Sequence, residues 1–204
     1  MGDVKAGERL PYRRLQALET RRRIAAAART VFAGSGYAAA SIESVAGEAG
    51  VAVRTVYSIF GSKKGILAAV CDEWLAEAGV AALFGEAMGE PDPARRLGLV
   101  AHLTRVQWEL GRDVRPMLEA GAASDSEVRT MLSGWKRERA RFLRLSLGDI
   151  ADRLSPGLSP DRAAGVLRAL TAAEVFDELT DGEGWSADEY ESWLAALLVE
   201  VMLT

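Results

Sequence analysis

The sequence of 204 residues is poor in the residues that build covalent cross-links, metal sites and membrane spans. It contains one cysteine, one histidine and six prolines. A single cysteine excludes an intramolecular disulfide framework, and the lack of any apolar run of about 18 residues excludes a helix that crosses a bilayer. The first fifteen residues also lack the apolar segment of a signal peptide, so we expect a cytoplasmic protein with no membrane partner.

Patterns for catalysis and cofactor binding are missing as well. His102 has no second histidine or cysteine at metal-ligand spacing, so we interpret it as a surface or packing residue and expect no metal site. Cys71 has no neighbouring cysteine or histidine, which favours a small buried hydrophobe over a redox-sensing thiol. Neither GxGxxG after a strand nor GxxxxGK[ST] occurs, so nucleotide binding has no motif. We expect no cofactor and no enzymatic activity.

Strand patterns are absent too. Runs of β-branched and aromatic residues with a period of two do not occur, whereas alanine, leucine, arginine and glutamate are abundant. The sequence therefore predicts an all-α fold. Caps and helix breakers divide it into about nine helices, with a loop around residues 85–93. The expected helices span residues 20–33, 42–49, 52–60, 63–78, 94–110, 116–122, 126–154, 160–180 and 187–203.

A short helix, a glycine turn and a second short helix follow one another in residues 41–60. Ser41 is a good N-cap, apolar residues then recur at helical spacing, and Gly50 stops the first helix. This order is typical of a helix-turn-helix, whose second helix is expected at residues 52–60. The outward side chains of that helix are short, polar or aromatic, which suits a helix lying in the major groove of DNA. The predicted DNA-contacting residues are Ser41, Val53, Arg54, Thr55, Tyr57, Ser58, Lys63 and Lys64.

The charge distribution agrees with this interpretation. Residues 1–64 contain eleven Lys and Arg against five Asp and Glu, a net charge of +6, whereas residues 65–204 contain fourteen against twenty-four, a net charge of −10. A basic N-terminal part can approach phosphates while the acidic remainder stays away from them. The overall charge of −4 hides this polarity.

The segment SIESVAGEAGV followed by RTVYSIFGSKKGIL resembles the DNA-binding domain of the TetR family of transcriptional regulators, over about Thr20 to Val70. The resemblance implies three N-terminal helices followed by a helical regulatory domain. It divides the chain into a flexible basic arm at residues 1–19, a helix-turn-helix DNA-binding domain at residues 20–62 and a ligand-binding and dimerisation domain at residues 63–204. Family members often have serine at the position of Ala52, so a helix cap is lost here.

The last two expected helices offer more apolar surface than one packing side needs. A pair from each of two subunits predicts a four-helix interface with two-fold symmetry, although purely intramolecular packing is the alternative. The homodimer would present two recognition helices to an operator with an inverted repeat. The predicted interface residues are Phe176, Leu179, Tyr190, Trp193, Leu194, Leu197 and Val201.

The resemblance also implies a small-molecule effector, and two inward helix faces suggest where it binds. The row containing Arg139 places a cation between aromatic residues on an apolar strip, where it needs a carboxylate from the protein, such as Glu174, or from a ligand. Pairing within the protein, or extension of the side chain to solvent, is the alternative to ligand contact. We therefore predict a pocket for a partly apolar, anionic molecule. Its expected lining residues are Thr104, Gln107, Trp135, Arg139 and Phe142.

Together these features predict a homodimeric, ligand-responsive transcriptional regulator that binds a double-stranded DNA operator. Repression with release by the effector is expected. Two alternatives stay open from the sequence: an activator that recruits polymerase, and a helical ligand-binding or enzyme-like protein whose N-terminal motif is a structural relic.

Overall fold

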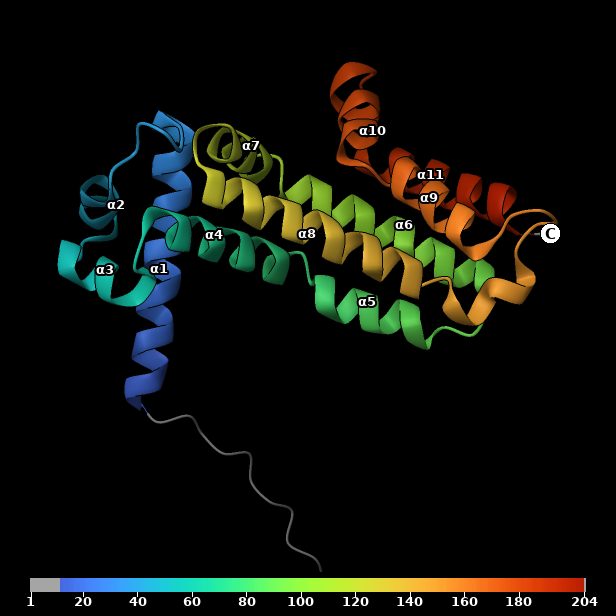
Figure 1. Cartoon of the computed structure of the whole chain (residues 1–204), viewed down its shortest axis with the longest axis horizontal. Coiled ribbons are helices and arrows are strands. Elements are labelled where there is room, and N and C mark those ends of the chain that lie inside the picture. Colours follow the sequence, from blue (N-terminus) through green and yellow to red (C-terminus); the bar gives the residue numbers. More distant parts are fainter. Residues whose placement is uncertain (1–11, 204) are drawn as a thin grey trace, which may run out of the picture. The chain divides into compact units, whose positions relative to one another are not determined.

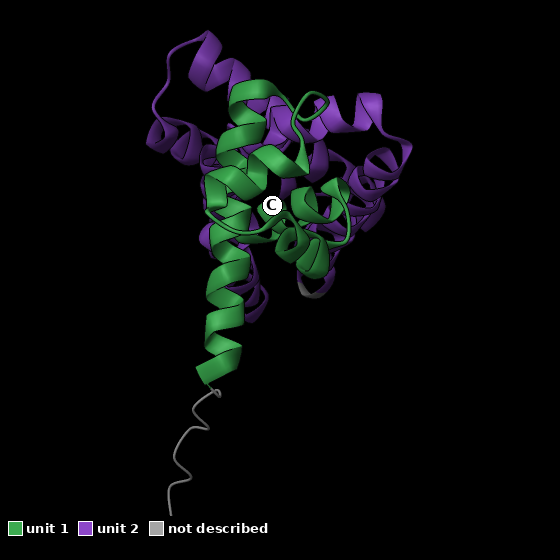
Figure 2. Ribbon diagram, turned by 90° about the vertical axis from the view of Figure 1, so that its left-hand side faces the viewer, with its two compact units in different colours: residues 1–73 green, residues 74–204 purple. Residues whose placement is uncertain are grey.

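The computed structural model describes residues 12–203, and within them every regular element is a helix. The nearest approach to a strand pairing there is an isolated antiparallel bridge between Leu154 and Leu203. The expected all-α fold is thus confirmed. Contacts divide the chain into two compact units, Met1–Glu73 and Trp74–Thr204 (Figure 2). The finer division at residue 62 stays a prediction.

The first unit is built from three helices and most of a fourth (Figure 1). They are α1 (Tyr12–Ser35), α2 (Ile42–Ala49), α3 (Val53–Phe60) and α4 (Lys63–Glu77), the last of which runs on into the second unit. Helix α2 packs against α1, and the rings of Phe32 and Tyr37 meet edge to face at 5.4 Å between centroids in the core. Val45, Val56 and Ile66 add fully buried side chains from α2, α3 and α4.

Helix α1 begins eight residues before the expected cap. Thr20 does not cap it, because the Thr20 hydroxyl donates to the carbonyl of Gln16 (2.8 Å) one turn earlier in the same helix. Residues 12–19 are therefore helical, which corrects their assignment to the flexible arm. Residues 1–11 of that arm lie outside the described residues.

The second unit contains the remaining helices. They are α5 (Val80–Gly89), α6 (Pro93–Leu110), α7 (Val114–Ser124), α8 (Ser126–Leu145), the 3-10 helix η1 (Gly148–Arg153), α9 (Pro160–Leu170), α10 (Ala173–Asp177), the π-helix η2 (Glu178–Gly182) and α11 (Ala187–Met202). Helix α6 is central, since α5, α10 and α11 all pack against it, and its most extensive contact is with α11 (Figure 1). Helix α8 packs against α7 and α9.

The prediction of a loop near residues 85–93 was mostly wrong, because α5 occupies residues 85–89. The glycines of this segment suggested a break, yet Val80, Leu83, Phe84 and Ala87 have the spacing of one helical face. Ala87 is buried, and Val80 and Phe84 point toward the core of the unit. Packing of that face against α6 outweighs the weak helix propensity of glycine.

Two long expected helices are interrupted. The helix expected at residues 126–154 ends at Leu145, where the Ser146 hydroxyl donates to the carbonyl of Leu143 (2.8 Å) and the chain turns into η1. The helix expected at residues 160–180 breaks after Leu170 and continues as α10 and η2. At that break the Thr171 hydroxyl donates to the carbonyl of Leu167 (2.7 Å). The break leaves the Thr171 carbonyl free for bonds to other helices.

Candidate nucleic-acid interface and effector cavity

The turn between α2 and α3 is defined by its caps. Ser41 and Ser44 form a capping box at the start of α2, each hydroxyl oxygen accepting from the other residue's backbone N–H. Gly50 ends the helix in the left-handed region with φ of +62°, which favours glycine, and Val51 N–H donates to the Ala46 carbonyl (3.0 Å). The expected helix-turn-helix therefore has the local geometry that its sequence encodes.

The start of α3 lacks a side-chain cap. Ala52 occupies the N-cap position and makes no side-chain hydrogen bond. This absence was expected, because alanine stands here where family members often have serine. The first N–H groups of α3 are consequently open to an outside acceptor such as a phosphate oxygen.

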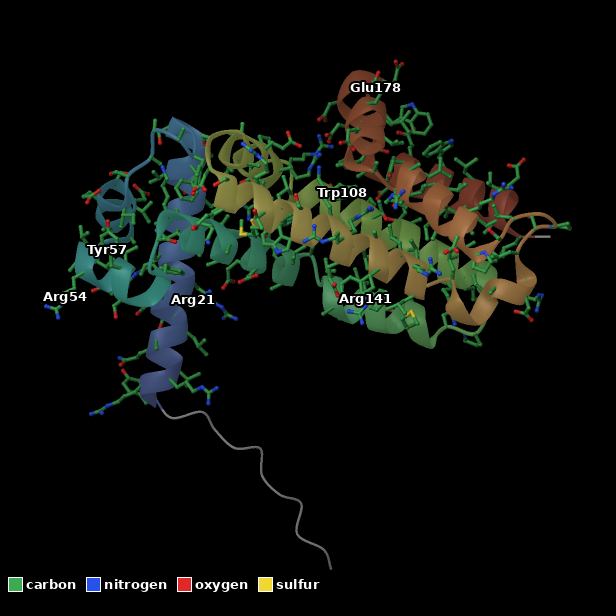
Figure 3. All side chains as sticks on the ribbon, viewed as in Figure 1. Arg21, Arg54, Tyr57, Trp108, Arg141 and Glu178 are labelled. Atoms are coloured by element: carbon green, nitrogen blue, oxygen red, sulfur yellow. The ribbon has the colours of Figure 1, made fainter. Side chains whose placement is uncertain are left out.

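The outer face of α3 carries the predicted recognition side chains. Val56 is fully buried, whereas Arg54, Tyr57 and Ser58 are exposed, and 49% of the Tyr57 surface is accessible. Figure 3 shows Arg54 and Tyr57 pointing away from the helix. Val53 and Thr55 are half-buried at its edge. Arg54 has no ion pair within the described residues.

Lys63 has a different role from the predicted one. Its ammonium donates to the carbonyls of Tyr37 (2.8 Å), Ala38 (3.1 Å) and Ala40 (3.0 Å), and it lies 4.6 Å from the centroid of the Tyr37 ring. An ammonium has three N–H donors, so all of them are used within the protein. Lys63 therefore holds the turn before α2 and has no donor left for a phosphate. Lys64, half-buried beside it, stays a predicted phosphate contact.

A cavity of about 420 Å³ lies in the second unit, lined by side chains from α4 through α8 and from α9 and α10. All five residues predicted to line an effector pocket, Thr104, Gln107, Trp135, Arg139 and Phe142, border it. Five aromatic side chains form much of its wall. They are Trp74, Phe84, Trp108, Trp135 and Phe142. That a small molecule binds there stays a prediction.

Arg139 does not pair with Glu174, which was one expected partner. Its guanidinium donates instead to the Thr171 carbonyl and to the Thr171 hydroxyl (2.9 Å), and it lies 5.0 Å from the centroid of the Trp108 ring. Burial lowers the pKa of Arg139 to about 10, an effect that the negative charge of Glu174 partly opposes. Within the described residues no carboxylate lies within 4 Å of this cation.

The sequence did not predict the hydrogen bond and the arginine contact that hold the Trp108 ring. Its indole N–H donates to the Thr171 carbonyl (3.0 Å), and the Arg115 guanidinium lies 5.5 Å from its ring centroid. Arg115 itself makes two hydrogen bonds to the carboxylate of Asp177. Nothing local in the sequence marks this cluster, because Thr171 becomes an acceptor only where the helix breaks.

Three of the predicted dimer residues were wrong. Phe176, Tyr190 and Leu194 are fully buried within the single chain, where the Phe176 and Tyr190 rings meet edge to face at 4.9 Å. They belong to the core between α10, α11 and α6, so a second subunit cannot reach them. The remaining predicted residues, Leu179, Trp193, Leu197 and Val201, are half-buried or exposed.

Neither Cys71 nor His102 lies in surroundings that favour a reactive or metal-binding role. Cys71 is buried, and its burial raises the pKa of the thiol far above the usual value, which disfavours the reactive thiolate. His102 lies at the surface, with Nδ1 3.0 Å from the Glu191 carboxylate. No cluster of metal-binding side chains occurs among residues 12–203, and none of the helices in that range is long and apolar enough to cross a bilayer.

Comparison with known proteins places this geometry in context. Residues 24–70 match the family model of bacterial regulatory proteins, tetR family. No curated protein matches the sequence. The resemblance inferred from the sequence is confirmed over this segment, which contains α2, α3 and about half of both α1 and α4.

Solved structures share the fold along nearly the whole chain. NalD, the secondary repressor of the MexAB-OprM multidrug efflux pump in Pseudomonas aeruginosa, has a TM-score of 0.70 at 22% identity, with 93% of this chain and 98% of NalD covered. FadR from Bacillus subtilis, in complex with stearoyl-CoA, has a TM-score of 0.66 at 19% identity over 88% and 98% of the two chains. SmeT, in complex with triclosan, has a TM-score of 0.75 at 18% identity over 91% and 92%. At these identities the likeness establishes a common fold.

Proposed function

We propose that this chain, whose residues 24–70 match the DNA-binding domain of the tetR family, is a ligand-responsive transcriptional repressor. The observation that carries the proposal is the outer face of α3, where Arg54, Tyr57 and Ser58 are exposed on the second helix of a helix-turn-helix in a basic part of the chain. The cavity of the second unit provides the place for an effector. Its target being DNA, the protein acts in the cytoplasm, and no catalytic step is part of its role.

Duplex binding follows from the chemistry of α3. Arg54 can make bidentate hydrogen bonds to a guanine edge or to a phosphate, and the Tyr57 hydroxyl can donate to a phosphate of the DNA backbone. The uncapped N–H groups at the start of α3 and the hydroxyl of Ser41 are suited to phosphate oxygens. Val53 and Thr55, half-buried on the same helix, would contact base edges such as the thymine methyl group.

A homodimer is part of the proposal, with a smaller interface than the sequence suggested. Trp193, Leu197 and Val201 recur every four residues on one face of α11, and Val201 is 39% exposed. Leu179 on η2 is half-buried as well. Two such faces related by a two-fold axis would bury these residues and present two α3 helices to an inverted repeat, with half-sites about one helical turn of 34 Å apart or a multiple of it.

Helix α4 connects the proposed effector site to the proposed DNA-binding domain. Trp74 and Leu75 near its C-terminal end border the cavity, and the Trp74 indole N–H donates to the Gln107 carbonyl (2.9 Å). Its first residue, Lys63, is bonded to the turn before α2. An effector that favours one position of Trp74 would shift the population of α4 orientations and so change operator affinity.

Selection of bound sequences from random duplex DNA tests the proposal. An inverted repeat recovered at physiological salt is the expected result, and failure to enrich any duplex would refute DNA regulation. Arg54→Ala should reduce affinity, and should lower the slope of log affinity against log salt by about one if Arg54 contacts a phosphate. Arg141→Ala removes a matched exposed arginine from α8 and should leave both quantities unchanged.

A further inference from the structure

The proposed effector cavity carries information about the chemistry of its ligand. Its volume of about 420 Å³ lies within the usual range of small-molecule sites and equals the share of about fourteen water molecules in the liquid. A compact molecule with two rings fits within such a space. The inference below rests on the proposed effector role of this cavity.

The wall selects planar, apolar groups. Trp74 and Trp108 lie with ring centroids 6.2 Å apart, and Phe84 and Phe142 lie 4.8 Å apart. These pairs come from α4, α6, α5 and α8, so aromatic faces border the cavity from several sides. A rigid aromatic ligand can stack on them with little loss of internal freedom, whereas a long flexible chain would lose rotamer entropy on binding.

Two polar groups that border the cavity have hydrogen-bonding capacity that the described residues do not use. The side-chain amide of Gln107 has no hydrogen-bond partner within the described residues, although the residue is only 8% exposed. Arg139 donates from one terminal nitrogen to Thr171, while its other N–H groups have no acceptor there. Neither group is among the fully buried atoms that lack a partner, so water in the cavity can bind them. An occupant that accepts from both would replace that water with charge-assisted hydrogen bonds.

The charged residues that border the cavity determine whether an anionic or a cationic occupant is favoured. Arg115, the other arginine beside Trp108, is neutralised by its two bonds to Asp177. Arg139 is bonded to no carboxylate within the described residues, and the charge of Glu174 acts on it only from a distance. Exposed carboxylates of Glu119, Glu138 and Glu174 also border the cavity, together with the exposed cations Lys136 and Arg168. Water screens those rim charges more strongly than it screens the partly buried guanidinium of Arg139.

We infer that the cavity binds a small aromatic carboxylate, with its rings between the aromatic walls and its carboxylate at Arg139 and Gln107. The carboxylate would accept from the unused N–H groups of Arg139 and from the Gln107 amide nitrogen. It would thereby supply the negative charge that the protein itself does not place beside this arginine. A cationic ligand would meet the same arginine as a like charge.

Calorimetric titration of the full chain with three probes of one shape tests this inference. The probes are 2-naphthoate, its neutral amide and the 2-naphthylmethylammonium cation. We expect naphthoate to bind at least about tenfold more tightly than the amide, as a charge-assisted hydrogen bond implies, and the cation to bind most weakly. Equal affinities, or no binding of naphthoate up to millimolar concentration, would overturn the inference.

Substitutions in α8 test whether Arg139 causes the preference for naphthoate over the neutral amide. Arg139→Met should bring naphthoate and amide to within about threefold of each other, and Arg139→Lys should keep part of the preference for the anion. Arg141→Met removes the same charge two residues away, where the side chain is exposed and paired with Glu138, and should behave as the wild type (Figure 3). Circular dichroism confirms that each variant is folded. A preference for the anion that survives Arg139→Met contradicts the assignment.

Duplex binding of the ligand-free protein, measured in parallel by fluorescence anisotropy, separates the two proposals. Duplex binding without a preference for naphthoate means that only the ligand class is wrong. Naphthoate binding through Arg139 without any duplex binding means that the ligand class is right and that the regulatory function is wrong.

Discussion

The role of Lys63 can be tested by replacing it with methionine, which keeps the length of the side chain and removes the ammonium. Three carbonyls then lose their donor. The carbonyl of Ala38 is exposed and can bind water instead, but those of Tyr37 and Ala40 are partly buried. The structure therefore predicts that Lys63→Met destabilises the first unit rather than its contact with DNA.

The size of the expected destabilisation follows from the partly buried carbonyls of Tyr37 and Ala40. Leaving a buried acceptor unsatisfied costs about 1–3 kcal/mol, and the lost contact with the Tyr37 ring adds about 0.5–1 kcal/mol. Allowing for partial access of water, we expect the free energy of unfolding of the first unit to fall by about 3 kcal/mol.

Urea denaturation with two probes makes this measurable. All five tryptophans lie in residues 74–193, so their fluorescence reports the second unit, whereas circular dichroism reports helices of both. In Lys63→Met the transition seen by circular dichroism should move to lower urea by more than the fluorescence transition does.

Arg54→Met is the matched control, because Arg54 is exposed and makes no ion pair within residues 12–203. It should leave the urea transitions unchanged and weaken duplex binding, while the folded Lys63→Met protein keeps the wild-type dependence of duplex affinity on salt. If Lys63→Met is as stable as the wild type and instead loses salt dependence, the ammonium contacts phosphate and our assignment is refuted.

Three further variants address the second unit. Leu197→Glu places a charge on the proposed dimer face of α11, so analytical ultracentrifugation should detect monomers with unchanged helicity; a persistent dimer would place the interface elsewhere. Among residues 12–203 the buried hydroxyl of Tyr190 has no hydrogen-bond partner, and burial raises the pKa of Tyr190 to about 12. Protonated Tyr190 therefore adds stability that is fully present below about pH 10 and is lost as the pH rises through about 12. Tyr190→Phe should match the wild type at neutral pH and become relatively more stable by about 2 kcal/mol in urea titrations at pH 12, whereas a constant difference would contradict this. Gly111→Ala would place Cβ 2.4 Å from the Trp74 ring, so we expect a loss of about 1–3 kcal/mol in thermal unfolding and a shift in tryptophan fluorescence; unchanged values would show that the ring moves freely.

Local features of the chain were predictable because they depend on neighbours in sequence. The cap at Ser41, the stop at Gly50 and the amphipathic pattern of α3 each involve residues within one or two turns. The same holds for the inward faces of α6 and α8, whose periodicity selected Gln107 and Arg139 before their helices could be placed together.

Contacts between distant segments were decided only by tertiary structure. The three bonds of Lys63 span more than twenty residues, so the sequence could show a cation near a DNA-binding motif but not the carbonyls that occupy it. The apolar residues of α11 could not be divided between the core and a dimer interface from the sequence. Which of them are buried, as Tyr190 and Leu194 are, and which stay half-exposed, as Leu197 does, depends on how α11 packs in the second unit.

The sequence by itself determined an all-helical chain with a helix-turn-helix and a basic N-terminal part, since helix periodicity and caps act over short distances. Tertiary structure decided which charges and apolar faces remain available for a partner. The break at Thr171 illustrates the difference: its free carbonyl becomes meaningful only when α6 and α8 bring Trp108 and Arg139 to it.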